Sequence, residues 1–164
     1  MSALLVALLM ASSMVLSPPA ERRDAGAFTA RDLGGKRVRL ADLSGKVVML
    51  DFWATWCAPC RQELPHLDGL QRTRGQDGLV VIAVATDGPQ TASNVDGVVR
   101  RSGWQMSVVH DADGSLVGRY NPRGDNPYVV VIDRRGRVAA THAGYAPGDE
   151  RALAAVIDAA LGEP

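Results

Sequence analysis

Two apolar runs of strand length dominate the middle of the chain. Residues 46–53 and 79–86 are nearly continuous in apolar side chains and rich in β-branched residues. Strands that are buried on both faces of a parallel sheet have this pattern. The stretch between them carries three leucines at helical spacing, Leu64, Leu67 and Leu70. The pattern therefore predicts a strand–helix–strand unit with parallel strands.

The rest of the pattern completes one α/β domain. Residues 25–45 contain short β-prone pieces around a double glycine, which predicts an N-terminal hairpin. Residues 91–103 form a weaker helix candidate, and 128–145 indicate a second, antiparallel hairpin. Residues 149–161 repeat apolar side chains at helical spacing. We expect a central mixed sheet flanked by helices, with a hairpin extension at its N-terminal side.

An apolar run without any charge, residues 3–16, precedes this domain. It is shorter than the roughly 20 residues that a membrane-spanning helix needs and fits the apolar region of a secretory signal. We expect residues 1–24 to be a signal peptide or N-terminal anchor with a short linker, and 25–164 to be the domain. The alternatives are a core helix and a misread start codon. No cysteine lies near the run, which excludes lipid attachment there.

The overall charge is balanced, with 18 basic and 18 acidic side chains in 164 residues. Such a chain has no general field that attracts nucleic acid or an acidic membrane surface. Its length corresponds to one domain with a single sizeable core. We therefore expect no nucleic-acid partner, and recognition through a local site.

The candidate chemistry lies where the first long strand passes into the helix. Cys57 would begin that helix, where unpaired backbone N–H groups and the helix dipole favour a thiolate. Cys60 follows one turn later, close enough for a disulfide. Pro59 falls in the first turn, where a missing N–H costs nothing. A thiolate at Cys57 could attack a substrate disulfide and Cys60 could then resolve the mixed disulfide.

Other uses of two cysteines fit less well. A structural zinc site takes four ligands, and the chain has no second pair of cysteines. His66 could be a third ligand, but a fourth is missing. Covalent haem attachment needs a histidine after the second cysteine, where Arg61 stands. A purely structural disulfide remains open, although closing so short a loop adds little stability. We expect neither a metal nor a cofactor.

Two acidic residues flank the cysteine pair. Asp51 lies inside the apolar strand, so burial should raise its pKa and it could exchange a proton with Cys60. The alternative is that Asp51 hydrogen-bonds a backbone group at the end of the strand. Glu63, one turn after Cys60, could be a second perturbed carboxyl group or an ordinary solvated glutamate.

These residues carry a family resemblance. The sequence "DFWATWCAPC", with Pro65 five residues after the second cysteine, resembles the thioredoxin superfamily, and "FWATWCAPCRQELPHL" is most similar to its exported TlpA/ResA-like thiol–disulfide oxidoreductases. Residues 110–145 follow the family's order of turn, short helix, proline loop and two strands. The resemblance covers about residues 26–162 and implies the thioredoxin fold.

The resemblance assigns roles to single residues. Cys57 matches the exposed nucleophile and Cys60 the resolving thiol. Asp51 aligns with the buried acid of thioredoxins, where many exported relatives have Asn, and Glu63 matches a carboxylate that the exported branch often carries.

It also implies a substrate-binding surface, for which we expect four residues, Trp56, Pro59, Asn126 and Pro127. Pro127 matches the cis-proline whose loop pairs with an extended substrate segment. Asn126 stands where the family more often has Thr, Val or Gly. Trp56 is expected to line the substrate groove, whereas Trp53 is expected to pack in the core.

Taken together, the resemblance implies an exported enzyme in the bacterial periplasm or on the outer face of the cytoplasmic membrane. It would reduce disulfides of exported proteins or the cysteines of apocytochrome c, act as a monomer with a possible N-terminal tether, and receive electrons from a membrane thiol donor. A disulfide-forming oxidant or thiol peroxidase is the alternative within the enzymes. A redox-dependent chaperone or soft-metal delivery protein is the alternative from another class.

Overall fold

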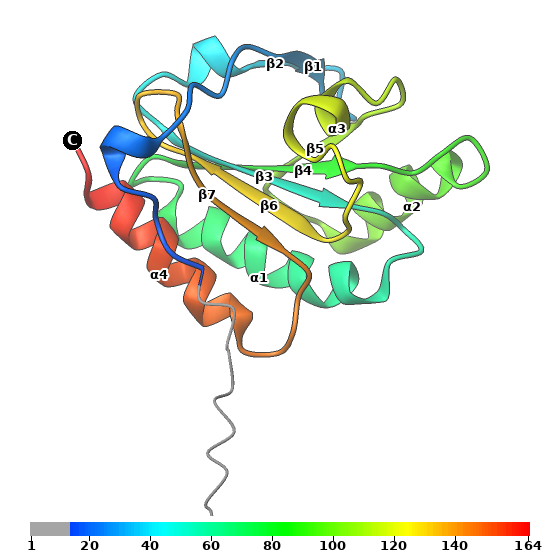
Figure 1. The fold of residues 1–164 in the computed structure, drawn as a ribbon. Coiled ribbons are helices and arrows are strands. Elements are labelled where there is room, and N and C mark those ends of the chain that lie inside the picture. The colour runs from blue at the N-terminus through cyan, green and yellow to red at the C-terminus, as the bar shows by residue number, and fades with distance from the viewer. Residues whose placement is uncertain (1–13) are drawn as a thin grey trace, which may run out of the picture.

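The computed structural model describes residues 14–164, so the predicted apolar leader lies outside the described residues up to position 13. Two 3-10 turns accompany the strands and helices (Figure 1). The elements are, in chain order, β1 (Thr29–Arg31), β2 (Arg37–Arg39), β3 (Val47–Trp53), α1 (Ala58–Arg74), β4 (Leu79–Ala85), α2 (Ala92–Ser102), β5 (Ser107–His110), α3 (Ser115–Tyr120), β6 (Tyr128–Ile132), β7 (Val138–Ala143) and α4 (Asp149–Gly162).

A five-stranded mixed sheet with the order β5-β4-β3-β6-β7 forms the centre of the domain. β3 pairs in parallel with β4, and β4 with β5. β6 runs antiparallel to β3 and to β7. The predicted parallel pair and the antiparallel hairpin are therefore confirmed. β1 and β2 form the predicted N-terminal hairpin as a separate two-stranded sheet.

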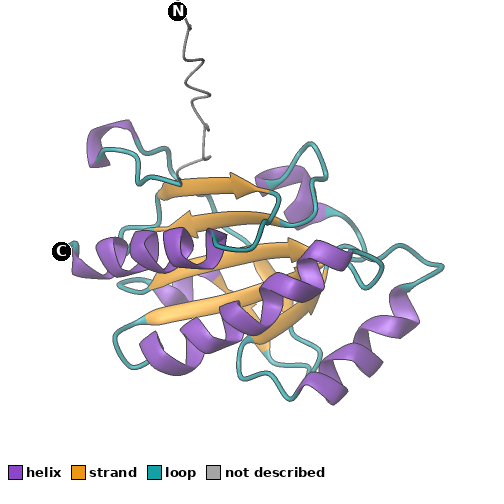
Figure 2. Ribbon diagram, turned by 90° about the horizontal axis from the view of Figure 1, so that it is seen from below, coloured by secondary structure: helices purple, strands orange, loops and turns teal. Residues whose placement is uncertain are grey.

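Alternate side chains of β3 enter two separate apolar cores. Val48, Leu50 and Phe52 point to the face that carries the hairpin and α3. Met49 and Trp53 point to the opposite face, where α1, α2 and α4 pack. Figure 1 shows the sheet between these layers, and Figure 2 shows the helices of the second layer in front of it. Burial on both faces explains why β3 and β4 are apolar almost throughout.

One strand was not predicted from the sequence. β5 has only four residues, Ser107–His110, and pairs with the edge of β4. A run this short offers too few positions for an alternating pattern to be recognised. The strand exists because Val108 and Val109 enter the two opposite cores. Tertiary packing, more than local pattern, therefore fixes this edge of the sheet.

The segment before the hairpin contacts the domain through Arg22. Its guanidinium is buried and lies 3.0 Å from the carboxylate of Asp133 and 2.5 Å from that of Glu163. The N–H of Ser17 donates to the carbonyl of Ala139 on β7 (2.8 Å). These contacts join the N-terminal segment to the end of β6, to β7 and to the end of α4. In residues 14–164, no helix combines the length and the apolar character required to cross a bilayer.

Candidate active site

Cys57 and Cys60 form a disulfide where β3 passes into α1. Cys57 is the N-cap of the helix, and the N–H of Cys60 donates to its Sγ (3.3 Å). The N–H of Cys57 donates to the carbonyl of Ala54 (3.0 Å), which fixes the tight turn out of the strand. The Cys57 sulfur therefore lies among the first N–H groups of α1, as the sequence predicted. An anion is favoured at this position.

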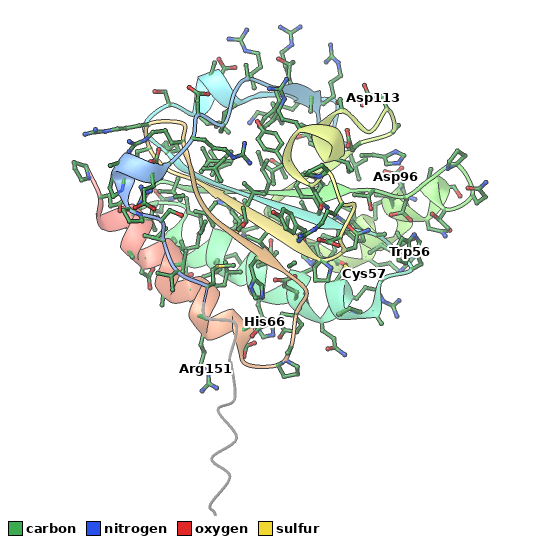
Figure 3. All side chains as sticks on the ribbon, in the orientation of Figure 1. Trp56, Cys57, His66, Asp96, Asp113 and Arg151 are labelled. Carbon is green, nitrogen blue, oxygen red and sulfur yellow. A yellow bond between two sulfur atoms is a disulfide. The ribbon has the colours of Figure 1, made fainter. Side chains whose placement is uncertain are left out.

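The two sulfurs differ in their access to solvent. Cys60 is fully buried, whereas Cys57 keeps 4% of its surface exposed. Trp56 next to it is 64% exposed (Figure 3), and Trp53 is completely buried against Trp104. The predicted packing role of Trp53 is confirmed. An incoming reagent reaches the pair at Cys57, beside an exposed indole.

Asp51 is enclosed in the core beneath the disulfide. Asp51 is two residues from Met49 and two from Trp53 on β3, so its side chain points to the same face as theirs. Cys60 and α1 pack on that face. Asp51 is fully buried, and neither carboxyl oxygen has a hydrogen-bond partner. The alternative in which Asp51 bonds a backbone group is therefore wrong. Burial without a partner raises the pKa of Asp51 to about 8.

Glu63 provides a second buried carboxyl group from α1. Only 2% of its surface is exposed, and its Oε2 has no hydrogen-bond partner. Burial, followed by the charges of Asp51 and Asp149, raises the pKa of Glu63 to about 9. The reading of Glu63 as a solvated glutamate is therefore wrong. Glu63 borders a groove of about 290 Å³ between α1 and α4, which also contains His66 and Glu150, so this carboxyl group has a route to solvent that Asp51 lacks.

The loop before β6 lies at the same end of the sheet as the disulfide. Tyr128 pairs with Phe52, so Pro127 comes level with the end of β3. The Asn126–Pro127 peptide bond is cis, as the resemblance implied. In the orientation that satisfies its neighbours, the Asn126 amide donates to the carbonyls of Phe52 (3.2 Å) and Asp125 (3.0 Å). The loop is thus bonded directly to the strand that leads to Cys57.

Comparison with known proteins agrees with this geometry. A model of the AhpC/TSA family matches residues 22–141. The chain belongs to the AhpC/TSA family. A curated relative, the thiol-disulfide oxidoreductase ResA of Bacillus thuringiensis (strain Al Hakam), is 35% identical over 116 residues. The match covers 71% of this chain and 65% of the relative, so the chain spans less than two thirds of that protein's length.

Solved structures of similar proteins show that the fold is the thioredoxin fold. One is a putative thiol:disulfide interchange protein DsbE from Chlorobium tepidum, with a TM-score of 0.79 and 34% identity, covering 86% of this chain and 97% of that chain. Another is the exposed lipoprotein thioredoxin Etrx1 of Streptococcus pneumoniae strain TIGR4, with a TM-score of 0.71 and 28% identity, covering 82% and 99%. The expected thioredoxin fold is confirmed.

In this family member, the loop that carries Cys57 is held by residues that the sequence did not single out. Asp87 is buried and accepts hydrogen bonds from the N–H (3.0 Å) and the hydroxyl of Thr55. Thr86 donates from its N–H to the carbonyl of Trp53 (2.8 Å). Both residues follow β4 directly, at the carboxyl ends of the parallel strands. A polar pair at the end of a buried parallel strand is a signal that could have found them.

Metal-binding groups are not gathered at this site. Over residues 14–164, no three side chains among His, Cys, Asp and Glu are placed to hold one ion. His66 stacks on Tyr145 with ring centroids 6.3 Å apart. The groups that the described residues bring to the site are two sulfurs and two protonatable carboxyl groups.

Proposed function

We propose that this protein is a thiol–disulfide oxidoreductase that uses Cys57 and Cys60 as its redox pair. One observation supports this function above the others. A disulfide at the beginning of α1 joins Cys57, which keeps 4% of its surface exposed, to the fully buried Cys60, on the face where two carboxyl groups with raised pKa values lie. Perturbed acids beside a nucleophile are typical of functional sites. A disulfide with a purely structural role does not require unpaired buried carboxyl groups, which cost stability.

The reaction transfers two electrons and two protons. The Cys57 thiolate attacks one sulfur of a substrate disulfide and releases the other as a thiolate, which takes up a proton. Asp51 or Glu63 in its carboxylate form then accepts the proton of Cys60. The Cys60 thiolate attacks the Cys57 sulfur, forming the enzyme disulfide and releasing the second substrate sulfur as a thiolate, which takes up the second proton. The substrate disulfide is reduced and the enzyme dithiol is oxidised.

The substrates are proposed to be disulfides of exported proteins, including the cysteines of apocytochrome c. In this proposal, Trp56, Pro59, Asn126 and Pro127 form the surface that receives the substrate. A membrane thiol donor returns the enzyme to its dithiol form. The protein works as a monomer on the outer side of the cytoplasmic membrane or in the periplasm, with residues 1–24 as a signal peptide or N-terminal anchor and a short linker. The description of the Streptococcus pneumoniae relative as an exposed lipoprotein thioredoxin supports an extracytoplasmic location.

The reduction potential of the Cys57–Cys60 pair tests this function and its direction. We expect a value near the thioredoxin level of about −270 mV, which marks a reductant, and not near −120 mV, which marks an oxidant. The protein should also accelerate the reduction of insulin by dithiothreitol. Cys57→Ser is the matched control, and insulin reduction by that variant at the wild-type rate contradicts the assignment.

Two further assays separate the alternative functions. Turnover of hydrogen peroxide that matches the rate with protein disulfides would indicate a thiol peroxidase. Stoichiometric retention of copper or zinc by the reduced protein at low free metal would indicate metal delivery. We expect neither, because both cysteines belong to one pair with no further ligands gathered beside it in residues 14–164.

A further inference from the structure

A groove lies beside the redox pair, between the beginning of α1 and one side of α2. Its volume is about 420 Å³, and its walls include Trp56, Arg61, Thr91, Ser93 and Arg101. Ser93, Gly97 and Arg101 recur every four residues along α2 and therefore lie on one side of the helix. We call this hollow the α2 groove. Trp56 is the one described residue that this groove shares with the proposed substrate-receiving surface, and the other residues of its wall have no role in the proposed reaction.

The groove is basic although the whole chain is neutral. Arg61 and Arg101 are exposed, and none of the described residues that line the groove is Asp or Glu. Within residues 14–164, neither guanidinium forms a salt bridge. By contrast, Arg100 on the same helix pairs with Asp96 at 3.1 Å. Two uncommitted guanidinium groups therefore face one small hollow.

Two acids near the groove are already engaged. Asp87 lies behind the wall of the groove, is buried, and accepts both hydrogen bonds that Thr55 donates. Asp68 lines the next hollow along α1 and is bonded to Arg72 (2.6 Å) and to the N–H of Gln105 (2.6 Å). Neither acid is paired with the two guanidinium groups of the α2 groove.

The groove is close to the sulfur that reacts first. Trp56 precedes Cys57 directly, and Arg61 follows Cys60 directly. Figure 3 shows Trp56 and Cys57 together at the end of the molecule where α2 lies. A chain segment bound in the groove therefore belongs to the same substrate whose disulfide reaches Cys57.

We propose that the α2 groove binds an acidic segment next to the target disulfide of the substrate protein. This inference rests on the proposed oxidoreductase function and adds the class of substrate. Guanidinium groups pair with carboxylates in a directed geometry, and the hydroxyls of Thr91 and Ser93 offer further donors. Trp56 supplies an apolar surface beside them. The groove thus selects substrates with Asp or Glu within a few residues of the cysteine.

The test compares two disulfide-bonded peptides that differ only in two residues beside the cysteine, Glu–Glu in one and Ser–Ser in the other. The readout is the kcat/KM for the Glu–Glu peptide divided by that for the Ser–Ser peptide. If a substitution changes the reactivity of the cysteines, it changes both values equally, and the ratio is unaffected. For the wild-type protein at low salt we expect a ratio of about 10, since each exposed pair contributes modestly. The ratio should fall as salt screens the charges.

The variants locate the effect. Arg61→Glu/Arg101→Glu should bring the ratio to about 1 or below. Arg100→Glu changes the same charge on the same helix outside the groove, and should keep the ratio within about twofold of wild type. A wild-type ratio near 1, or a ratio near 10 that survives in the double variant, overturns the inference.

A neutral disulfide, bis(2-hydroxyethyl) disulfide, separates this inference from the proposed function. The wild-type protein and Arg100→Glu should both reduce it. If they reduce it but show no preference for the acidic peptide, only the groove inference fails. If the wild-type protein reduces neither the neutral disulfide nor the peptides, the oxidoreductase function fails, and the groove inference with it.

Discussion

Asp51 of β3 and Glu63 of α1 are two buried carboxyl groups on elements that pack together, and after burial itself the charge of Asp51 contributes most to the raised pKa of Glu63. Ionising one acid therefore makes ionising the other harder. At neutral pH the pair retains at least one proton, and the two groups titrate as a unit. Such a pair can take a proton from Cys60 while keeping the total buried charge low.

The buried acid should reduce stability at neutral pH. In the folded protein Asp51 keeps its proton up to about pH 8, whereas in the unfolded chain it ionises near its ordinary pKa of 3.8. The free energy of unfolding should therefore fall as pH rises from about 4 to about 8. Asp51→Asn has no proton to lose there, so the oxidised variant should be about 2–4 kcal/mol more stable than wild type at pH 7.5.

Urea denaturation at pH 4.5 and pH 7.5 measures this difference. The gain from Asp51→Asn should be large at the higher pH and several-fold smaller at the lower one, which lies only just above the pKa of 3.8 at which Asp51 ionises in the unfolded chain. An Asn variant that is less stable than wild type at pH 7.5 would show that Asp51 is ionised and paired in the folded protein.

The same substitution should slow the second step of the reaction. Resolution of the mixed disulfide needs a base for Cys60, and loss of a general base costs roughly 10²-fold or more. We expect the wild-type rate to rise with pH through the range of about 8 to 9, where the two acids ionise. Stopped-flow measurement with a preformed mixed disulfide isolates this step, with Glu63→Gln as the companion variant. Identical pH profiles for wild type and both variants would remove the acids from the mechanism.

Replacement of the buried sulfur should trap the intermediate. In Cys60→Ser, Cys57 still attacks the substrate, but no second thiol is present to release it. Mass spectrometry after incubation with a disulfide substrate should find a covalent adduct on Cys57 in near-stoichiometric amount. Cys57→Ser is the paired control and should carry none, because Cys60 is fully buried. Adducts on Cys60 in that control would show that Cys60, and not Cys57, attacks the substrate first.

The Arg22 contacts should contribute to stability. Arg22→Met leaves the buried carboxylate of Asp133 without one of its two cationic partners, and we expect a loss of about 2–4 kcal/mol in unfolding free energy. Arg39→Met is the matched control, because Arg39 and Asp42 form an exposed pair that solvent screens, so its loss should destabilise the protein much less. Equal effects of the two substitutions in urea denaturation would show that Arg22 does not hold the N-terminal segment.

The position of the redox pair was predictable because its signals are local. An apolar run followed by Cys57 and Cys60 defines a strand, a turn and a helix start within a few residues. Asp51 was recognisable for the same reason, as a single acid inside an apolar strand. The burial of Glu63 was not, because a glutamate on a helix is buried only if another element covers it. That cover comes from α4, far along the chain.

The remaining differences also arise from long-range contacts. The hydrogen bond of Asp87 to Thr55 was not predicted because the two residues are 32 positions apart in sequence. Arg22 is fixed by Asp133 and Glu163, 111 and 141 residues away. The position of Asp87 after a buried parallel strand could have marked it as a candidate. No local pattern identifies the distant partner of either residue, so the sequence alone did not predict these contacts.

The reactivity of Cys57 tests the central claim most directly, namely that the beginning of α1 stabilises its thiolate. The fully reduced protein is treated with iodoacetamide at pH 7 beside free cysteine, and peptide mapping follows each sulfur. We predict alkylation of Cys57 about tenfold faster than that of free cysteine, with Cys60 much slower. Alkylation of Cys57 at or below the rate of free cysteine would contradict the account.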